Sequence, residues 1–310
     1  MLNNNHLGGR LLKILKWSFL LTVLFSLSAC KSDLTGVLDP KGLVAFEERK
    51  LLFDTLALML IVVLPVIVMS LAFVYHYQIS HRVRDYKPNW SHSVFLESLW
   101  WGIPCAIIIV LAILTWKKTH ELDPYTRIQG QQEAPLLIQA IALPWKWLFI
   151  YPEQHIATVN YLAIPVGRQV EFWFTTDNVP MSSFMVPQLG SQIYTMTAMR
   201  TRLHLLATEA GDFIGMNTQF NGDGFSDMRF MAHAMPPEQL DAWFKQVAQS
   251  PTTLDSTTYD ALLKPEEKVA PQYFVYGSED LFQKVMDLYM NSDGPTHPRA
   301  AIAPFTQSVK

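Results

Sequence analysis

The sequence has little charge and few cysteines. Charged residues make up 16% of its 310 positions, against 50% hydrophobic residues, and only two residues are cysteine. So low a charge fraction indicates a chain that enters a membrane. The 24 basic residues are scattered and outnumbered by 27 acidic ones. This argues against a nucleic-acid partner, because duplex binding needs a clustered basic face.

Motifs for several kinds of chemistry are also missing. The sequence contains no glycine-rich phosphate loop, no HExxH zinc motif and no GxSxG nucleophile motif. Its nine histidines are dispersed, and none forms a pair with metal-ligand spacing. The sequence therefore offers no support for a nucleotide phosphatase, a zinc protease or a serine hydrolase, and we assign it no metal.

The first 29 residues are predicted to be an export signal. Basic residues within the first 16 positions precede an apolar run that ends near Leu27. The tetrapeptide LSAC, which ends at Cys30, resembles the lipobox of bacterial lipoproteins, in which the cysteine is lipidated and becomes the mature N-terminus. We expect lipid attachment at Cys30 and a periplasmic segment over 30–50. The alternative is an ordinary signal peptide with an incidental cysteine.

Two apolar runs follow, and both are long enough to cross a membrane. They cover 51–75 and 93–116, and about 20 apolar residues suffice to span the ~30 Å hydrocarbon core. The intervening loop, 76–92, carries three lysine or arginine residues and only one acid. The positive-inside rule places this loop in the cytoplasm, so the chain after about 117 is expected in the periplasm.

After the second span the sequence pattern changes to short β-rich runs separated by proline and glycine. This spacing predicts that residues 125–235 form a small β-sandwich or barrel domain. A C-terminal aromatic-rich helical region is expected over 236–290, with a flexible tail over 291–310. The clearest strand-like runs are Ala134–Ile141, Ala157–Ile164, Gln169–Thr175 and Arg202–Ala207, and the helical runs are Pro236–Gln249 and Ser278–Met290.

Three stretches in this order resemble subunit II of haem-copper terminal oxidases. WKWLFIY (145–151) is similar to the family's aromatic W-x-W stretch, and SSFMVPQLG (182–190) is similar to its H-S-F-W-V-P-x-L-G segment. GMNTQFNGDGFSDM (215–228) resembles its copper loop, with Gly215 and Gly222 at matching offsets. The resemblance implies a two-helix transmembrane hairpin followed by an all-β cupredoxin-like Greek-key sandwich with C-terminal helices.

The copper ligands of that family are missing from this loop. In the copper-bearing branch, two thiolates, two imidazoles and a thioether hold a dinuclear copper centre. The matching ligand positions, and the glutamate between the thiolates, are here Ser182, Asn217, Gln219, Asn221, Phe225 and Met228. Only the thioether remains, so we expect a metal loop whose scaffold persists without its metal. A calcium loop is the alternative, but the EF-hand pattern fails at three of its positions.

Further segments are similar to subunit II of cytochrome bo-type ubiquinol oxidases. They are LTWKKTH (114–120), FIYPEQ (149–154), GSQIY (190–194) and TRLHL (201–205). This resemblance implies a proton-pumping complex of the bacterial inner membrane that oxidises ubiquinol and reduces oxygen to water. Haems and one copper are expected in subunit I and no cofactor in this chain. The expected partners are subunit I, subunit III, a small subunit IV, membrane lipid and ubiquinol, with no cytochrome c.

Three residues outside the loop carry further expectations. Glu97 lies at the cytoplasmic start of the second span, and the resemblance implies that it stands at the entrance of a proton-uptake path into subunit I. The alternative is an acid that simply reaches water from the headgroup region. We interpret Trp145 and Trp147 as aromatic residues packed at the junction between the sandwich and the membrane.

Two other classes of function remain open at this stage. One is a lipid-anchored periplasmic scaffolding or assembly protein that never joins an oxidase. The other is a copper-bearing subunit II of a cytochrome c oxidase, which the substituted ligands of 215–228 argue against.

Overall fold

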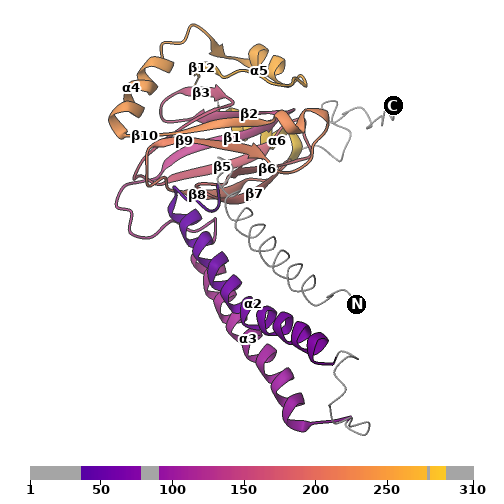
Figure 1. Cartoon of the computed structure of the whole chain (residues 1–310). Coiled ribbons are helices and arrows are strands. Elements are labelled where there is room, and N and C mark those ends of the chain that lie inside the picture. Colours follow the sequence, from indigo (N-terminus) through magenta and orange to yellow (C-terminus); the bar gives the residue numbers. More distant parts are fainter. Residues whose placement is uncertain (1–35, 78–90, 278–279, 291–310) are drawn as a thin grey trace, which may run out of the picture. The chain divides into compact units, whose positions relative to one another are not determined.

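A computed structural model of the chain describes residues 36–77, 91–277 and 280–290 (Figure 1). The chain divides into two units, Met1–Asp39 and Pro40–Lys310, and all the helices and strands described below belong to the second. The expected signal peptide (1–29), the expected lipid site at Cys30 and the expected tail (291–310) lie outside the described residues.

Two long apolar helices begin the second unit. Helix α2 covers Leu43–His76 and helix α3 covers Val94–Glu121, and by length and composition each could cross a membrane. A proline lies inside each of them, as transmembrane helices tolerate when neighbouring groups satisfy the freed carbonyl. The Lys118 ammonium lies 2.9 Å from the Glu47 carboxylate and so joins the two helices near the sandwich.

Helix α2 starts eight residues before the expected span, because its first turns pack on the sandwich. Ala45 is buried, and its backbone N–H donates to the Leu189 carbonyl at 3.2 Å. The preceding backbone pairs with the end of a strand, where Leu43 N–H donates to the Leu206 carbonyl at 3.2 Å. The hairpin is therefore attached to the β domain through hydrogen bonds as well as through the chain.

The β domain is a sandwich of two sheets. Within the described residues, a seven-stranded sheet has the order β11-β12-β3-β2-β1-β5-β8 and a five-stranded sheet has the order β4-β10-β9-β6-β7. The pairs β1–β5 and β4–β10 are parallel, and the remaining pairs are antiparallel except β11–β12. The strands are β1 Leu136–Leu143, β2 Lys146–Tyr151, β3 Ile156–Val159, β4 Tyr161–Pro165, β5 Val170–Thr176, β6 Met181–Val186, β7 Gly190–Met196, β8 Thr201–Leu205, β9 Gly211–Asn217, β10 Arg229–Met235, β11 Thr253–Leu254 and β12 Gln272–Tyr276.

Aromatic rings fill the space between the two sheets. Phe184 lies near their centre, with ring centroids 4.8 Å from Phe174, 5.3 Å from Phe230 and 5.5 Å from Trp147. Trp147 is fully buried there, so its expected place at the junction with the membrane was wrong. The reason is the strand alternation of β2, which turns Trp147 inward together with Phe149.

The C-terminal residues cover the outer face of the seven-stranded sheet. Helices α5 (Ser256–Leu262) and α6 (Leu281–Met290) pack with β12 on outward-facing residues of β1, β2 and β3, while helix α4 (Pro237–Val247) packs on the main core. Both faces of β2 are therefore buried, which explains its continuous apolar run.

The C-terminal region differs from the expected pair of helices. It also contains α5 and the strands β11 and β12, and β12 extends the sheet by pairing with β3. Asp255 caps α5 by accepting a hydrogen bond from Thr258 N–H at 2.8 Å. The predicted fold class is confirmed: two apolar helices, a β-sandwich and C-terminal helices.

Candidate functional site

The glycine-punctuated loop connects β9 to β10 and contains a short 3-10 helix, Asp223–Asp227. Three of the positions predicted from the copper motif come together there. The Asn221 amide nitrogen lies 3.3 Å from Ser182 Oγ and 3.4 Å from Met228 Sδ. Ser182 and Met228 are fully buried. Ser182 and Asn221, which are 39 positions apart in sequence, thus lie side by side at the site that the resemblance implied.

Asn217 is a second fixed point of this loop. Its side-chain oxygen accepts hydrogen bonds from Ser183 N–H at 2.9 Å and Gln219 N–H at 3.1 Å, and its amide donates to the Gln219 carbonyl at 2.8 Å. Asparagine is suited to such turns because its side chain can bond to neighbouring backbone. At this position it closes the loop by hydrogen bonding.

Another predicted position, Phe225, lies in a different part of the loop. Its side chain is half-buried, and its ring centroid lies 5.7 Å from that of Phe220. Phe220 itself is 64% exposed. The two rings form a small aromatic pair beside the polar cluster of Ser182, Asn221 and Met228.

This donor set does not fit a dinuclear copper centre. A hydroxyl and an amide stand where the motif has an imidazole and a thiolate, and of the ligands that hold copper only the thioether is present. Across residues 36–77, 91–277 and 280–290, moreover, no three His, Cys, Asp or Glu side chains gather as a metal-binding group. We therefore derive no step through a metal in this loop.

Trp145 covers the loop, a role that sequence reasoning missed. Its indole N–H donates to the Asn221 carbonyl at 3.2 Å, and its ring lies over Gly222 and Gly224. A Cβ at Gly224 would lie 2.4 Å from the ring. Trp145 therefore belongs to the loop and not to a membrane junction, which corrects the earlier interpretation. The closely spaced glycines were the available signal, since they leave room for a large partner.

Glu97 lies in the first turn of α3. Ser93 caps this helix, and Glu97 Oε2 lies 3.4 Å from His92 Nδ1. The Glu97 side chain is 62% exposed. An acid in the first turn is stabilised by the helix dipole, and here it stays open to water or to a partner.

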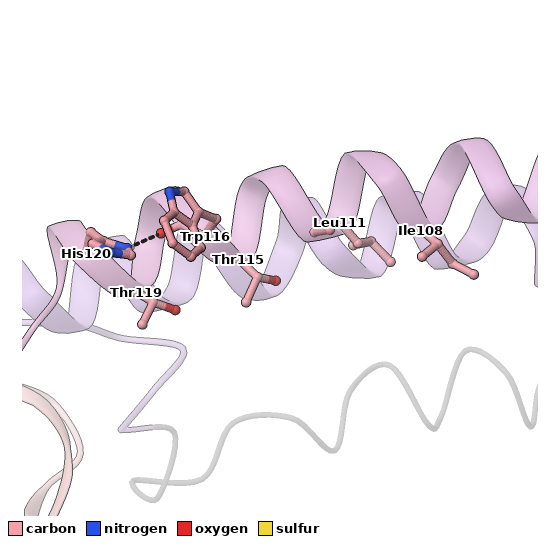
Figure 2. Close-up of a pocket in the computed structure, with 7 residues that line it drawn as sticks. Ile108, Leu111, Thr115, Trp116, Thr119 and His120 are labelled. Carbon is pink, nitrogen blue, oxygen red and sulfur yellow. Dashed lines mark hydrogen bonds between the residues drawn. The ribbon is translucent and has the colours of Figure 1, made fainter.

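The other end of α3 carries a groove (Figure 2). The described residues that line it all belong to α3 and pass from apolar Ile108 and Leu111 to Thr115, Trp116, Thr119 and His120. His120 Nδ1 lies 2.8 Å from the Trp116 carbonyl, as the dashed line in Figure 2 marks. Tryptophan at this place is typical of a helix that reaches the membrane interface.

The hairpin, the sandwich and the loop between β9 and β10 have the organisation expected of a haem-copper oxidase subunit II. Residues 248–293 match the family described as COX Aromatic Rich Motif. The chain is 47% identical over 275 residues to cytochrome bo(3) ubiquinol oxidase subunit 2 of Pseudomonas aeruginosa, covering 89% of this chain and 81% of that protein. It is 43% identical to ubiquinol oxidase subunit 2 of Acetobacter aceti, covering 86% and 85% respectively. The chain therefore belongs to the ubiquinol oxidase subunit 2 family.

Solved structures give a more distant likeness. The periplasmic domain of subunit II of cytochrome oxidase from Bradyrhizobium japonicum is 18% identical, with a TM-score of 0.35. The match covers 37% of this chain and 94% of that structure. The family assignment accordingly rests on the sequence relatives.

Proposed function

We propose that this chain is subunit II of a proton-pumping ubiquinol oxidase, whose complex oxidises ubiquinol and reduces oxygen to water. One observation carries the proposal: the loop positions that would bind copper meet in space, yet present a hydroxyl, an amide and a thioether. A subunit without this copper has no acceptor for electrons from cytochrome c. The names of its sequence relatives, ubiquinol oxidase subunit 2, support a quinol as the donor.

The chain itself would bind no redox cofactor. Haems and one copper would belong to subunit I, and subunit III and a small subunit IV would complete the complex. The sandwich would cap subunit I on the periplasmic side of the inner membrane. The basic residues of 76–92 support a cytoplasmic position for that loop, and the LSAC motif supports lipid attachment at Cys30.

Glu97 would stand at the cytoplasmic entrance of a proton-uptake path. Its place at the start of α3, next to the basic loop, and its exposed carboxylate support this role. We expect Glu97→Ala to slow oxygen reduction while the complex still assembles, and Glu97→Asp to keep more activity. Glu121→Ala, an exposed acid at the other end of α3, is the matched control. Unchanged turnover of the purified Glu97→Ala complex would remove the proposed role.

The function itself is tested by purifying the complex through a tag on this chain. We expect haem bands in the reduced-minus-oxidised spectrum and oxygen uptake driven by quinol but not by reduced cytochrome c. Oxygen uptake with cytochrome c, together with copper in this chain, would favour a cytochrome c oxidase. A chain that emerges without haem would favour a scaffolding or assembly protein.

A further inference from the structure

Trp145 has an unusual backbone conformation. Its φ angle is 60°, in the left-handed region that bulky residues rarely adopt. Such a conformation persists only where the surroundings fix it. Here the indole N–H bonds to the Asn221 carbonyl at 3.2 Å and the ring fills the space over Gly224. The turn between β1 and β2 is thus fixed to residues 215–228, the loop that resembles a copper site without its ligands, which we name the emptied metal loop.

The next residue, Lys146, connects this turn to the C-terminal residues. Its side chain is only 1% exposed, and its ammonium lies 3.6 Å from the Glu266 carboxylate. The same ammonium donates to the Lys264 carbonyl at 3.0 Å. Burial lowers the pKa of Lys146. A buried cation is costly without such partners, so the connection between α5 and β12 must stay docked while Lys146 is charged.

The same connection, residues 263–271, has two further contacts, at Val269 and Lys268. The Asn160 amide donates to the Val269 carbonyl at 2.9 Å, while its oxygen accepts from Trp147 N–H at 2.9 Å. The Lys268 ammonium lies 4.0 Å from the Asp227 carboxylate inside the loop. The connection therefore contacts the β1–β2 turn and the loop itself.

A buried carboxylate attaches the helices on either side of this connection. Asp177 is fully buried and accepts hydrogen bonds from the Tyr259 hydroxyl of α5 at 2.6 Å and the Tyr289 hydroxyl of α6 at 2.7 Å. Hydrogen bonds to a charged acceptor are the stronger kind. Asp177 directly follows β5 and leads into β6, the strand that carries Ser182.

We propose that residues 256–277 and 280–290, which we name the clamp, hold the emptied metal loop in its shape. In a metal site, coordination bonds fix the ligand loop, and binding free energy becomes folding free energy. Here Lys146, Asp177 and the residues around Trp145 provide that constraint through contacts with the clamp. The proposal goes beyond the proposed function, and it does not depend on which donor reduces the oxidase.

The test is hydrogen–deuterium exchange of the full chain in its purified complex, read by mass spectrometry on peptides that cover 215–228. Two variants release the clamp: Lys146→Met, and the pair Tyr259→Phe with Tyr289→Phe. We expect loop exchange to become about tenfold faster in each, because Lys146→Met removes the cation that bonds the Lys264 carbonyl and the tyrosine pair removes both hydroxyls that bond buried Asp177. Ser250→Ala is the matched control, since it removes a hydrogen bond from Ser250 Oγ to the Tyr273 carbonyl of the clamp that involves neither Lys146 nor Asp177.

The outcome in the loop decides the proposal. If clamp peptides exchange faster while the loop is unchanged, the C-terminal residues are an independent cover and the proposal is wrong. If Lys146→Met speeds exchange throughout the sandwich, including peptides of β5, the tyrosine pair decides the question. The proposal is then wrong if the tyrosine pair speeds exchange in clamp peptides but not in the loop. Because exchange is read in the loop and not through turnover, this result is independent of the oxidase assignment.

Discussion

Substitution of Gly215 by alanine tests whether the first glycine of the loop motif is a packing residue. Gly215 in β9 lies directly opposite Phe230 in β10, and an added Cβ would lie 2.0 Å from the Phe230 ring. That ring is buried, with centroids 5.1 Å from Phe149 and 5.3 Å from Phe184. It therefore has no free space into which it can move, and the added methyl group must strain the core.

The expected cost follows from overpacking. Inserting a methyl into a filled core costs about 1–3 kcal/mol, while replacing glycine stabilises by about 0.4–1 kcal/mol through the unfolded chain. A net loss of about 1–2 kcal/mol lowers the thermal midpoint of a domain this size by about 2–8 °C. Near-UV circular dichroism of the detergent-purified chain, recorded during heating, measures this thermal midpoint. Gly277→Ala, where no atom lies within 4 Å of the added Cβ, should leave the midpoint nearly unchanged.

A double-mutant cycle isolates the steric clash between the added methyl group and the Phe230 ring. Phe230→Leu removes the ring, so Gly215→Ala should cost less in that background than in the native chain. We expect a coupling of at least about 1 kcal/mol between the two sites. Simple additivity would refute the reasoning, because it would mean that Gly215 is needed for a reason other than the Phe230 ring.

Two further predictions concern the loop and the hairpin. Restoring the copper motif should give a chain that binds copper and shows a thiolate-to-copper absorption band. Metal analysis and visible spectroscopy measure these two properties. An unfolded or metal-free product would contradict the assignment of the ligand positions. The substitutions are Ser182→His, Asn217→Cys, Gln219→Glu, Asn221→Cys and Phe225→His. Lys118→Met should lower the thermal stability of the chain near pH 7, since Lys118 joins Glu47 and Glu121. Hydrogen bonding to Lys118 holds the pKa of Glu121 below its usual value of 4.5, so this contribution is present above that pH and fades as pH falls. The difference between native and Lys118→Met chains should therefore shrink in acid, and a constant difference would count against the contact.

Much of the fold could be predicted from the sequence because its signals are local. Two long apolar runs predict α2 and α3, and short β-rich runs with intervening turns predict a sandwich. The resemblance to the copper motif implied that the positions Ser182, Asn221 and Met228 share one site, and in the structure the Asn221 amide lies within hydrogen-bonding distance of the other two side chains. The register of β9 and β10 fixes both ends of the loop that carries Asn221 and Met228.

The missed features depend on tertiary contacts. Strand β12 has an ordinary short sequence, and its pairing with β3 is formed between residues more than a hundred positions apart. Trp145 and Trp147 are two positions apart, yet one covers a loop and the other fills the core, because a left-handed turn at Trp145 precedes β2. Composition could not separate these two roles. Asp177, Tyr259 and Tyr289 likewise show their relation only in three dimensions.

The clamp and the restored copper site should compensate for each other. In the native chain the loop is held by Asn217, by the Trp145 ring and, through Lys146, by the clamp. Bound copper would fix the same loop from inside, so the clamp should then matter less. We expect Lys146→Met to speed loop exchange about tenfold in the native sequence but little in the copper-loaded restored chain. Removing the copper with a chelator should bring the sensitivity back. If Lys146→Met speeds exchange equally with and without copper, the clamp and the metal do not act on the same loop conformation.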